Sequence, residues 1–233
     1  MNSVVLEYQS VDGRSHQVTV SPTTSSILLH QKEIVSIDLT PLQHCPDLQN
    51  LHLEGNPLHH VNLTPLKRCS GLRTLTLDGN QLTHIDLGPL QYCPNLQNLR
   101  LRRNQLTQVD LRPLHQCRRL RQLDLSENQL TQVDLRPIDQ WSLRFLGLSE
   151  NMLTQINLTP MAHCQGLRGL SLSTNQLRQI DVSPLFSCPY FQDLWVDRTV
   201  RLTAHPDYTE EGRIVPRGIQ QLIDEGRISW IKS

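Results

Sequence analysis

The sequence has no surplus of charge and few aromatic residues. Its 22 basic and 22 acidic side chains leave a formal net charge of +0, and aromatic residues make up 4% of the chain. General electrostatic binding to nucleic acid or to an anionic membrane needs a basic surplus, so this balance argues against both partners. No apolar run approaches the ~18 residues of a membrane-spanning helix. The first residues show no basic region followed by an apolar core, so we expect no signal peptide.

The sequence also lacks the motifs of common catalytic and cofactor sites. It contains no glycine-rich phosphate loop, no nucleophile elbow and no His-Glu-x-x-His zinc motif. His59, His60 and His84 could lie near one another, but zinc requires three or four ligands in tetrahedral geometry. Solvated turn positions are the favoured interpretation of these histidines. We therefore expect no enzyme activity, no cofactor and no metal site.

What the sequence does contain is an internal repeat. Leu51, Leu75 and Leu99 each begin the pattern Leu-x-Leu-x-x-Asn-x-Leu-x-x-(Ile/Val)-(Asp/Asn)-Leu-x-Pro-Leu-x-x-Cys, and successive copies lie 24 residues apart. Further copies begin at Leu123, Leu146 and Leu170, with degenerate ones at Ile27 and Leu194. A fixed period of this length is typical of solenoids, in which each unit buries its apolar face against the next.

The repeat sets the expected domain organisation. We predict a solenoid over residues 27–200, because the repeat runs through this range without a break. Residues 1–26 contain two alternating segments around Asp12-Gly13, which predict a β-hairpin that caps the first repeat. Residues 201–233 are expected to form a C-terminal cap, with a helix from Pro216 to Glu225 and a last strand at residues 228–231.

Each column of the repeat predicts a piece of local structure. The Leu-x-Leu alternation predicts a short strand with one buried face, and successive strands would form a parallel sheet. The asparagine column, which includes Asn104, predicts a ladder of amides bonded to the backbone. The proline column predicts the starts of short helices. The threonine or serine before each proline is expected to be the N-cap, and the aspartate or asparagine three residues before it predicts an Asx turn.

The cysteines share one column of the repeat, where Trp141 stands in for one copy: Cys45, Cys69, Cys93, Cys117, Cys164 and Cys188. A disulfide needs its Cβ atoms about 3.8 Å apart, and stacked side chains on the outer, wider side of a solenoid would miss that separation. Free cysteine also packs as a small hydrophobe. We therefore predict buried thiols and a cytoplasmic location, since the cytoplasm keeps thiols reduced.

These repeats resemble those of the leucine-rich repeat superfamily, because Leu-x-Leu-x-x-Asn-x-Leu occurs six times in register. The resemblance implies an α/β fold: a right-handed solenoid with a concave parallel β-sheet, and short helices or 3-10 turns on the convex side. It also implies that the concave sheet binds a protein, through surface positions that vary between family members.

One candidate binding cluster on the expected concave face is basic. Arg100, Arg102 and Arg103 would lie at mid-sheet with Asp124 on the next strand. The planar guanidinium groups suit carboxylates or phosphates, so this cluster could hold an acidic segment of a partner. The alternative is that carboxylates on neighbouring strands neutralise the arginines, through Asp78, Asp124 and Glu127.

A second candidate cluster is aromatic. Phe145 and Trp195 are expected on the concave sheet beside small residues, namely Gly147, Gly169 and Ser171. Interfaces concentrate binding energy in such anchors. The alternatives are that Trp195 packs under the C-terminal cap and that Phe145 compensates for the one-residue deletion near Trp141.

Two functional hypotheses follow. The first is a monomeric scaffold for protein–protein interaction that binds a protein partner through Arg100, Arg102, Arg103, Asp124, Phe145, Ser171 and Trp195. The second is a structural repeat protein that assembles with copies of itself and has no dedicated partner. A separate basic row precedes the concave face and would extend the basic surface to its rim: Arg121, Arg144 and Arg168.

Overall fold

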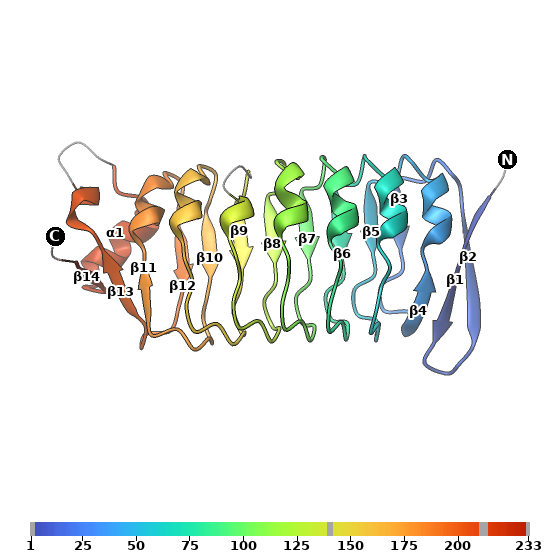
Figure 1. Ribbon diagram of the computed structural model, residues 1–233, viewed down its shortest axis with the longest axis horizontal. Coiled ribbons are helices and arrows are strands. Elements are labelled where there is room, and N and C mark those ends of the chain that lie inside the picture. The colour runs from blue at the N-terminus through green and yellow to red at the C-terminus, as the bar shows by residue number, and fades with distance from the viewer. Residues whose placement is uncertain (1–2, 139–141, 210–213, 232–233) are drawn as a thin grey trace.

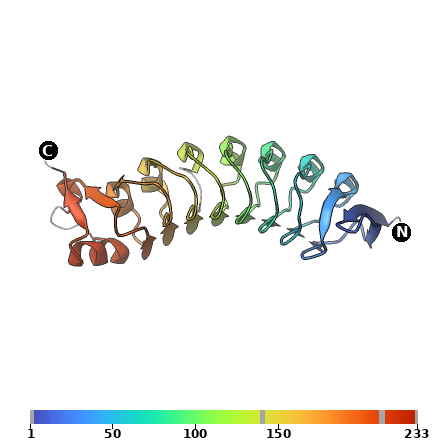
Figure 2. The ribbon, with the colours of Figure 1, turned by 90° about the horizontal axis from the view of Figure 1, so that it is seen from below.

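The computed structural model describes residues 3–138, 142–209 and 214–231, which form an elongated row of repeats (Figure 1) that curves into an arc (Figure 2). Strands line the concave side of the arc and 3-10 helices line the convex side (Figure 2). Trp141 lies outside the described residues, so its role in the cysteine column is not assigned. Among the described helices, none is long and apolar enough to cross a membrane.

One eight-stranded parallel sheet forms the concave side. Its strands are β3 (Ser26–Leu28), β5 (Asn50–His52), β6 (Thr74–Thr76), β7 (Asn98–Arg100), β8 (Gln122–Asp124), β9 (Phe145–Gly147), β10 (Gly169–Ser171) and β12 (Asp193–Trp195). The first leucines of successive repeats pair in register, as with Leu51 opposite Leu75 and Leu75 opposite Leu99. The predicted period and strand position are therefore confirmed. These leucines are fully buried, because alternation turns every second side chain to the core.

Short 3-10 helices form the convex side: η1 (Thr40–His44), η2 (Thr64–Arg68), η3 (Gly88–Tyr92), η4 (Arg112–Gln116), η5 (Arg136–Ile138), η6 (Thr159–His163) and η7 (Ser183–Ser187). The predicted Asx turns are present, since the Thr40 amide donates to Asp38 Oδ1 at 2.8 Å. The predicted hydroxyl N-caps are wrong. Leu39 occupies the N-cap of η1 and Thr40 is already helical, with no side-chain capping bond. The Asx turn satisfies the amide of Thr40 and starts the helix one residue earlier than expected.

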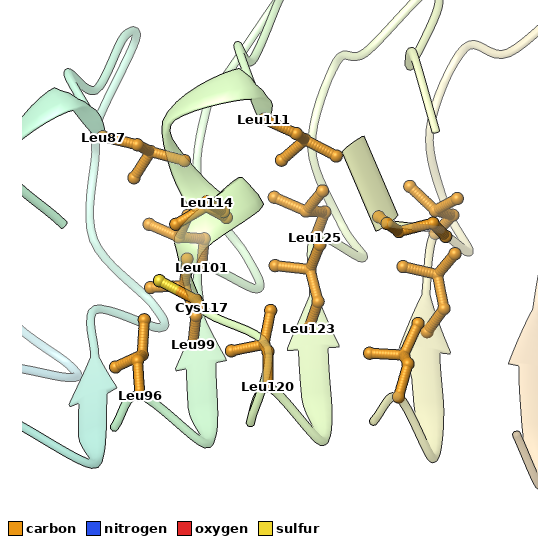
Figure 3. Packing of buried hydrophobic residues seen from close by; sticks show 14 of the residues in the cluster. Leu87, Leu96, Leu99, Leu101, Leu111, Leu114, Cys117, Leu120, Leu123 and Leu125 are labelled. Atoms are coloured by element: carbon orange, nitrogen blue, oxygen red, sulfur yellow. The ribbon is translucent and has the colours of Figure 1, made fainter. Parts of the chain in front are cut away.

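The core between the two sides is a stack of leucines and cysteines (Figure 3). The six cysteines are free and buried, which agrees with the predicted packing role. Their thiols donate weak hydrogen bonds to carbonyls of the preceding repeat. Cys117 Sγ lies 3.4 Å from the Leu90 oxygen, and Cys188 Sγ lies 3.2 Å from the Met161 oxygen. The column therefore links neighbouring repeats through sulfur without disulfides.

The asparagine column forms the predicted ladder behind the concave sheet. Asn104 Oδ1 accepts the Leu82 amide at 3.0 Å, and its Nδ2 donates to the carbonyls of Leu77 and Leu101 at 2.9 and 3.1 Å. The same arrangement recurs at Asn56, Asn80, Asn128, Asn151 and Asn175. Each amide therefore joins two repeats by satisfying backbone groups that the turn leaves unpaired.

Both ends are closed by elements that pair with strands of the solenoid itself. At the N-terminus β1 (Val4–Ser10) and β2 (Ser15–Val20) form an antiparallel hairpin, and β1 also pairs with β4 (Ile34–Asp38) of the first repeat. At the C-terminus β11 (Gln179–Asp181), β13 (Arg201–Ala204) and β14 (Ile228–Trp230) form a parallel sheet. The helix η8 (Pro206–Thr209) precedes α1 (Arg217–Asp224), which covers the expected helical segment.

The α1 helix packs against the solenoid through Gly218. Its amide donates to the Phe191 carbonyl at 3.1 Å, and a Cβ at this position would lie 2.3 Å from the Gln192 carbonyl oxygen. We expect Gly218→Ala to lower the free energy of unfolding by about 2 kcal/mol, because the backbone atoms that it meets cannot rotate away. Urea unfolding measures the change. The control is Gly71→Ala, whose Cβ would meet nothing closer than 3.7 Å. Equal stabilities for the two variants would show that the contact is easily relieved.

Candidate functional site

The residues that face outward from the concave sheet alternate with core leucines. Between the two leucines of each repeat the face presents, from β5 to β12, His52, Thr76, Arg100, Asp124, Gly147, Ser171 and Trp195. After the second leucine it presents Glu54, Asp78, Arg102, Ser126, Ser149, Ser173 and Asp197. The face therefore changes along the arc from charged residues, through small residues, to an aromatic ring.

The charged part is neutralised within itself. Arg100 forms an ion pair with Asp78, at 2.6 Å between Nη2 and Oδ2, and Arg102 Nε donates to Glu127 Oε1 at 2.7 Å. Burial raises the pKa of Asp78, and the guanidinium of Arg100 opposes that rise. The alternative that carboxylates from neighbouring repeats neutralise the arginines therefore applies to Arg100 and Arg102. About half of each arginine side chain stays exposed, 43% and 50%.

Two other predicted site residues lie differently from the expected cluster. Arg103 is exposed in the turn after β7, with φ at 56°, and no ion pair joins it to another described residue. Asp124 is only 7% exposed, and its Oδ1 accepts the Ser126 amide at 3.1 Å. Its carboxylate leans across Gly147, where a Cβ would lie 2.4 Å from Oδ1. The structure therefore keeps Arg100 and Arg102 together but separates Arg103 and covers most of Asp124.

A polar network on β5 and β6 was not predicted from the sequence. The Thr76 hydroxyl donates to Glu54 and lies 3.1 Å from His52 Nδ1. Since a hydroxyl has one proton, His52 Nδ1 must donate to the threonine oxygen. Burial opposes the ionisation of Glu54, but the hydrogen bond from Thr76 and the charge of His52 hold its pKa below the usual value.

The aromatic part is a ring pair held over a glycine. The centroids of Phe145 and Trp195 lie 6.1 Å apart at an interplanar angle of 64°, an edge-to-face contact. Strand β10 separates their strands, and a Cβ on Gly169 would lie 2.9 Å from Trp195 Cζ3 and 3.3 Å from Phe145 Cδ2. The absence of a side chain at Gly169 therefore allows the rings to meet. Trp195 remains 46% exposed, so it is not buried under the C-terminal cap.

Ser171 lies on β10, between the two strands that carry the rings. It pairs in register with Gly147 on one side and with Trp195 on the other. With Ser149 and Ser173 it forms a low floor of small side chains beside the ring pair. The structure thus brings Phe145, Ser171 and Trp195 together, as the sequence analysis expected of them.

The histidines provide no metal centre in the described part of the chain. The rings of His60 and His84 are tilted to each other, with centroids 5.6 Å apart. No group of three or more His, Cys, Asp or Glu residues among the described ones is arranged to hold a metal ion.

Comparison with known proteins connects this geometry to a family. A family model described as leucine rich repeat matches residues 70–130, and solved leucine-rich repeat structures superpose on most of the chain. The repeats of this chain are leucine-rich repeats. Domains of this family are typically protein-binding scaffolds and generally non-catalytic. No curated protein matches the sequence significantly.

Solved leucine-rich repeat proteins from bacteria and plants share the fold. An internalin (inlF) of Listeria monocytogenes is 25% identical, with a TM-score of 0.58, over 81% of this chain and 51% of its own. Internalin C2 of the same species is 24% identical, with a TM-score of 0.59, over 77% of each chain. The ectodomain of the Arabidopsis thaliana receptor kinase GASSHO1/SCHENGEN3, solved in complex with Casparian strip integrity factor 2, is 24% identical, with a TM-score of 0.60. That match covers 83% of the present chain but 22% of the ectodomain. The present chain spans about half the length of the inlF internalin.

Proposed function

We propose that this leucine-rich repeat protein is a scaffold that holds a protein partner on its concave face. The observation that carries the proposal is the ring pair of Phe145 and Trp195, which lies on the sheet outside the hydrophobic core, with Phe145 half-buried and Trp195 46% exposed. Burial of large rings against a partner contributes most of the energy in many interfaces. The typical role of the family supports the same conclusion.

Other residues of the concave face provide space and hydrogen-bonding groups beside the ring pair. The small-residue floor around Ser171 gives a partner side chain room beside the rings. The paired arginines Arg100 and Arg102 keep about half of each side chain exposed, so they can add hydrogen bonds to a partner without first breaking their ion pairs. Such satisfied polar groups around an apolar centre are the usual anatomy of a specific interface.

The test is affinity capture from native lysate by wild-type protein and by Phe145→Ala/Trp195→Ala. We expect the double variant to lose at least about thirtyfold in affinity for the captured partner, the effect of about 2 kcal/mol at an interface anchor. The matched control is Tyr92→Ala, which removes a half-exposed ring from the convex helix η3.

A cross-linking experiment locates the interface directly. A photoreactive phenylalanine analogue replaces Ser171 on the concave face or the exposed His115 on η4. We expect cross-links to the partner from position 171 alone. Cross-links from position 115 alone, or equal capture by the double variant and wild type, would show that the partner binds elsewhere.

The self-assembling alternative predicts a different solution mass. We propose a monomer, because both ends of the solenoid are covered by cap elements that pair with its own strands. We also propose that the protein works in a reducing compartment, the cytoplasm in the simplest case, since its cysteines are thiols stacked without disulfides. Sedimentation that gives a mass rising steadily with concentration would favour the array former.

A further inference from the structure

Three arginines stand on consecutive repeats where strands β8, β9 and β10 begin. We call Arg121, Arg144 and Arg168 the basic ladder. The Arg144 amide donates to the Arg121 carbonyl at 2.7 Å, and the Arg168 amide donates to the Arg144 carbonyl at 2.9 Å. Hydrogen-bonded neighbours in a sheet lie about 4.8 Å apart. The backbone therefore fixes three positive charges close together along one rim of the concave sheet.

The basic ladder has no counter-charge of its own. All three arginines are exposed, and none forms an ion pair with another described residue. The neutral residues Gln97 and Gln192 continue the column at its two ends. Asp193 follows Gln192 in the chain, and its backbone amide donates to the Arg168 carbonyl. Its carboxylate forms no ion pair with the basic ladder.

Several arginines elsewhere on the protein are in ion pairs, whereas the basic ladder places three arginines without ion pairs to other described residues on consecutive repeats. On the convex side Arg112 binds Asp110 at 2.8 Å, and Arg136 binds Asp134 at 2.7 Å. On the concave face Arg100 and Arg102 are likewise paired. Although the net charge of the whole chain is zero, the basic ladder is a row of positive charges without a counter-charge of its own. Its members repel one another, and an anionic occupant would relieve that repulsion.

The ring pair lies directly beside the basic ladder. Phe145 follows Arg144 in the chain, and its amide donates to the Arg121 carbonyl at 3.1 Å. Gly169, which lies under both rings, follows Arg168. A single extended segment could therefore reach the arginines and the rings together.

We propose that the basic ladder binds an acidic segment of the protein partner, and that an apolar side chain of the same segment rests on Phe145 and Trp195. This inference rests on the proposed scaffold function and adds the chemistry of the partner. Guanidinium groups bind carboxylates through two parallel hydrogen bonds, so three arginines in a row select a segment with several Asp or Glu residues.

A nucleic acid fits the same surface less well. Trp195 makes an edge-to-face contact with Phe145 and lies against Gly169, which leaves no slot between parallel rings for a base. Asp193 and Asp197 flank Trp195 on its own strand and the turn after it, and their charge opposes a phosphate backbone. An acidic peptide avoids this repulsion if its apolar residue, and not one of its carboxylates, lies beside Asp193 and Asp197.

The test selects peptides of about 12 residues from a random display library against the full chain, an extended length that spans several repeats. We expect enriched peptides to combine several Asp or Glu residues with a large apolar residue. Their affinity is then measured by fluorescence anisotropy for wild type, for Arg121→Gln/Arg144→Gln/Arg168→Gln, and for the control Arg112→Gln/Arg136→Gln/Arg178→Gln. The control removes the same charge from exposed arginines outside the ladder.

We expect the ladder variant to bind acidic peptides at least roughly tenfold more weakly than wild type, and the control to bind them nearly as well. Raising the salt from about 50 to about 200 mM should weaken wild-type binding more than binding by the ladder variant. Enrichment of basic or uncharged peptides, no enrichment, or equal losses in both variants would overturn the inference. So would oligouridylate RNA that binds more tightly than the peptides with the same ladder dependence.

The two proposals fail separately. If lysate capture depends on Phe145 and Trp195 but is unchanged in the ladder variant, the scaffold function stands and the acidic partner is wrong. If capture is unchanged by the ring substitutions as well, the scaffold function on this face is wrong.

Discussion

Raising the pH from about 8 to about 10 is expected to lower the free energy of unfolding by about 5 kcal/mol, a large part of a typical domain's stability. The cause is the buried cysteine column. Burial raises the pKa of Cys93, Cys117 and Cys188 to about 12, and that of Cys69 to about 11, from an ordinary value of 9.0.

The direction follows from which state ionises first. Below pH 9 the thiols are protonated in both states, so they add no pH dependence. Between pH 9 and about 11 to 12 the thiols of the unfolded chain lose protons while the folded ones keep theirs. The unfolded state is therefore stabilised by about 1.4 kcal/mol per thiol for each pH unit in this window. At pH 10 the four thiols together give the expected loss.

Urea unfolding at pH 8, 9 and 10 under a reducing agent measures the effect through the midpoint and slope. The control variant is Cys93→Ala/Cys117→Ala, which removes two of these four thiols. Its stability at pH 8 is expected to be lower than that of wild type, because each substitution leaves a small cavity. Its loss between pH 8 and pH 10, however, should be about half as large. The same loss in both proteins would mean that tyrosine or lysine ionisation, not the cysteine column, produces the alkaline instability.

The fold was predictable because its signals are local and repeated. Leu51, Leu75 and Leu99 each impose the same strand, and a pattern repeated six times leaves one register for stacking. The Asx turn at Asp38 was predictable for the same reason, since it involves residues two apart. The N-cap was misassigned because two short polar side chains, Asp38 and Thr40, compete to start the helix, and only three-dimensional geometry shows which one bonds.

The candidate site was less predictable, because its geometry depends on residues from different repeats. One signal was available: Gly55 and Gly79 occupy the column of Arg103, and all three have positive φ in the structure. Glycine in that column predicts a left-handed turn, so Arg103 could have been placed outside the strand. The meeting of Phe145 and Trp195 across Gly169 had no such signal. It depends on the rotamers of two rings separated by a strand, which no pattern in the sequence fixes.

Replacing Asn104 by alanine is expected to lower the free energy of unfolding by about 3 kcal/mol. The side chain is 8% exposed and satisfies the Leu82 amide and the carbonyls of Leu77 and Leu101. Alanine would leave the Leu82 amide buried without a partner. The carbonyls of Leu77 and Leu101 would each lose one hydrogen bond but keep another, from Asn80 and Asn128. An orphaned buried amide costs about 1–3 kcal/mol and each lost hydrogen bond about 1 kcal/mol or less. Urea unfolding at neutral pH measures the loss.

Asn175→Ala provides the matched control. Asn175 makes the equivalent bonds to Leu153, Leu148 and Leu172, but its side chain is partly exposed. Water can replace the missing amide there, so we expect a loss of only about 1 kcal/mol. Equal losses at the two positions would show that the asparagine ladder stabilises the fold through side-chain packing and not through buried hydrogen bonds.

The position of Asn104 gives the substitution a second expected consequence. Its amide joins the repeat that contains Leu77 to the one that contains Leu101, and in a solenoid stability depends on such contacts between neighbours. A break at mid-array should therefore reduce the coupling between the two halves. We expect the slope of the urea transition to decrease in Asn104→Ala, because the halves then unfold at different urea concentrations. Asn175 lies near the C-terminal end, so its substitution leaves most of the array coupled and the slope nearly unchanged.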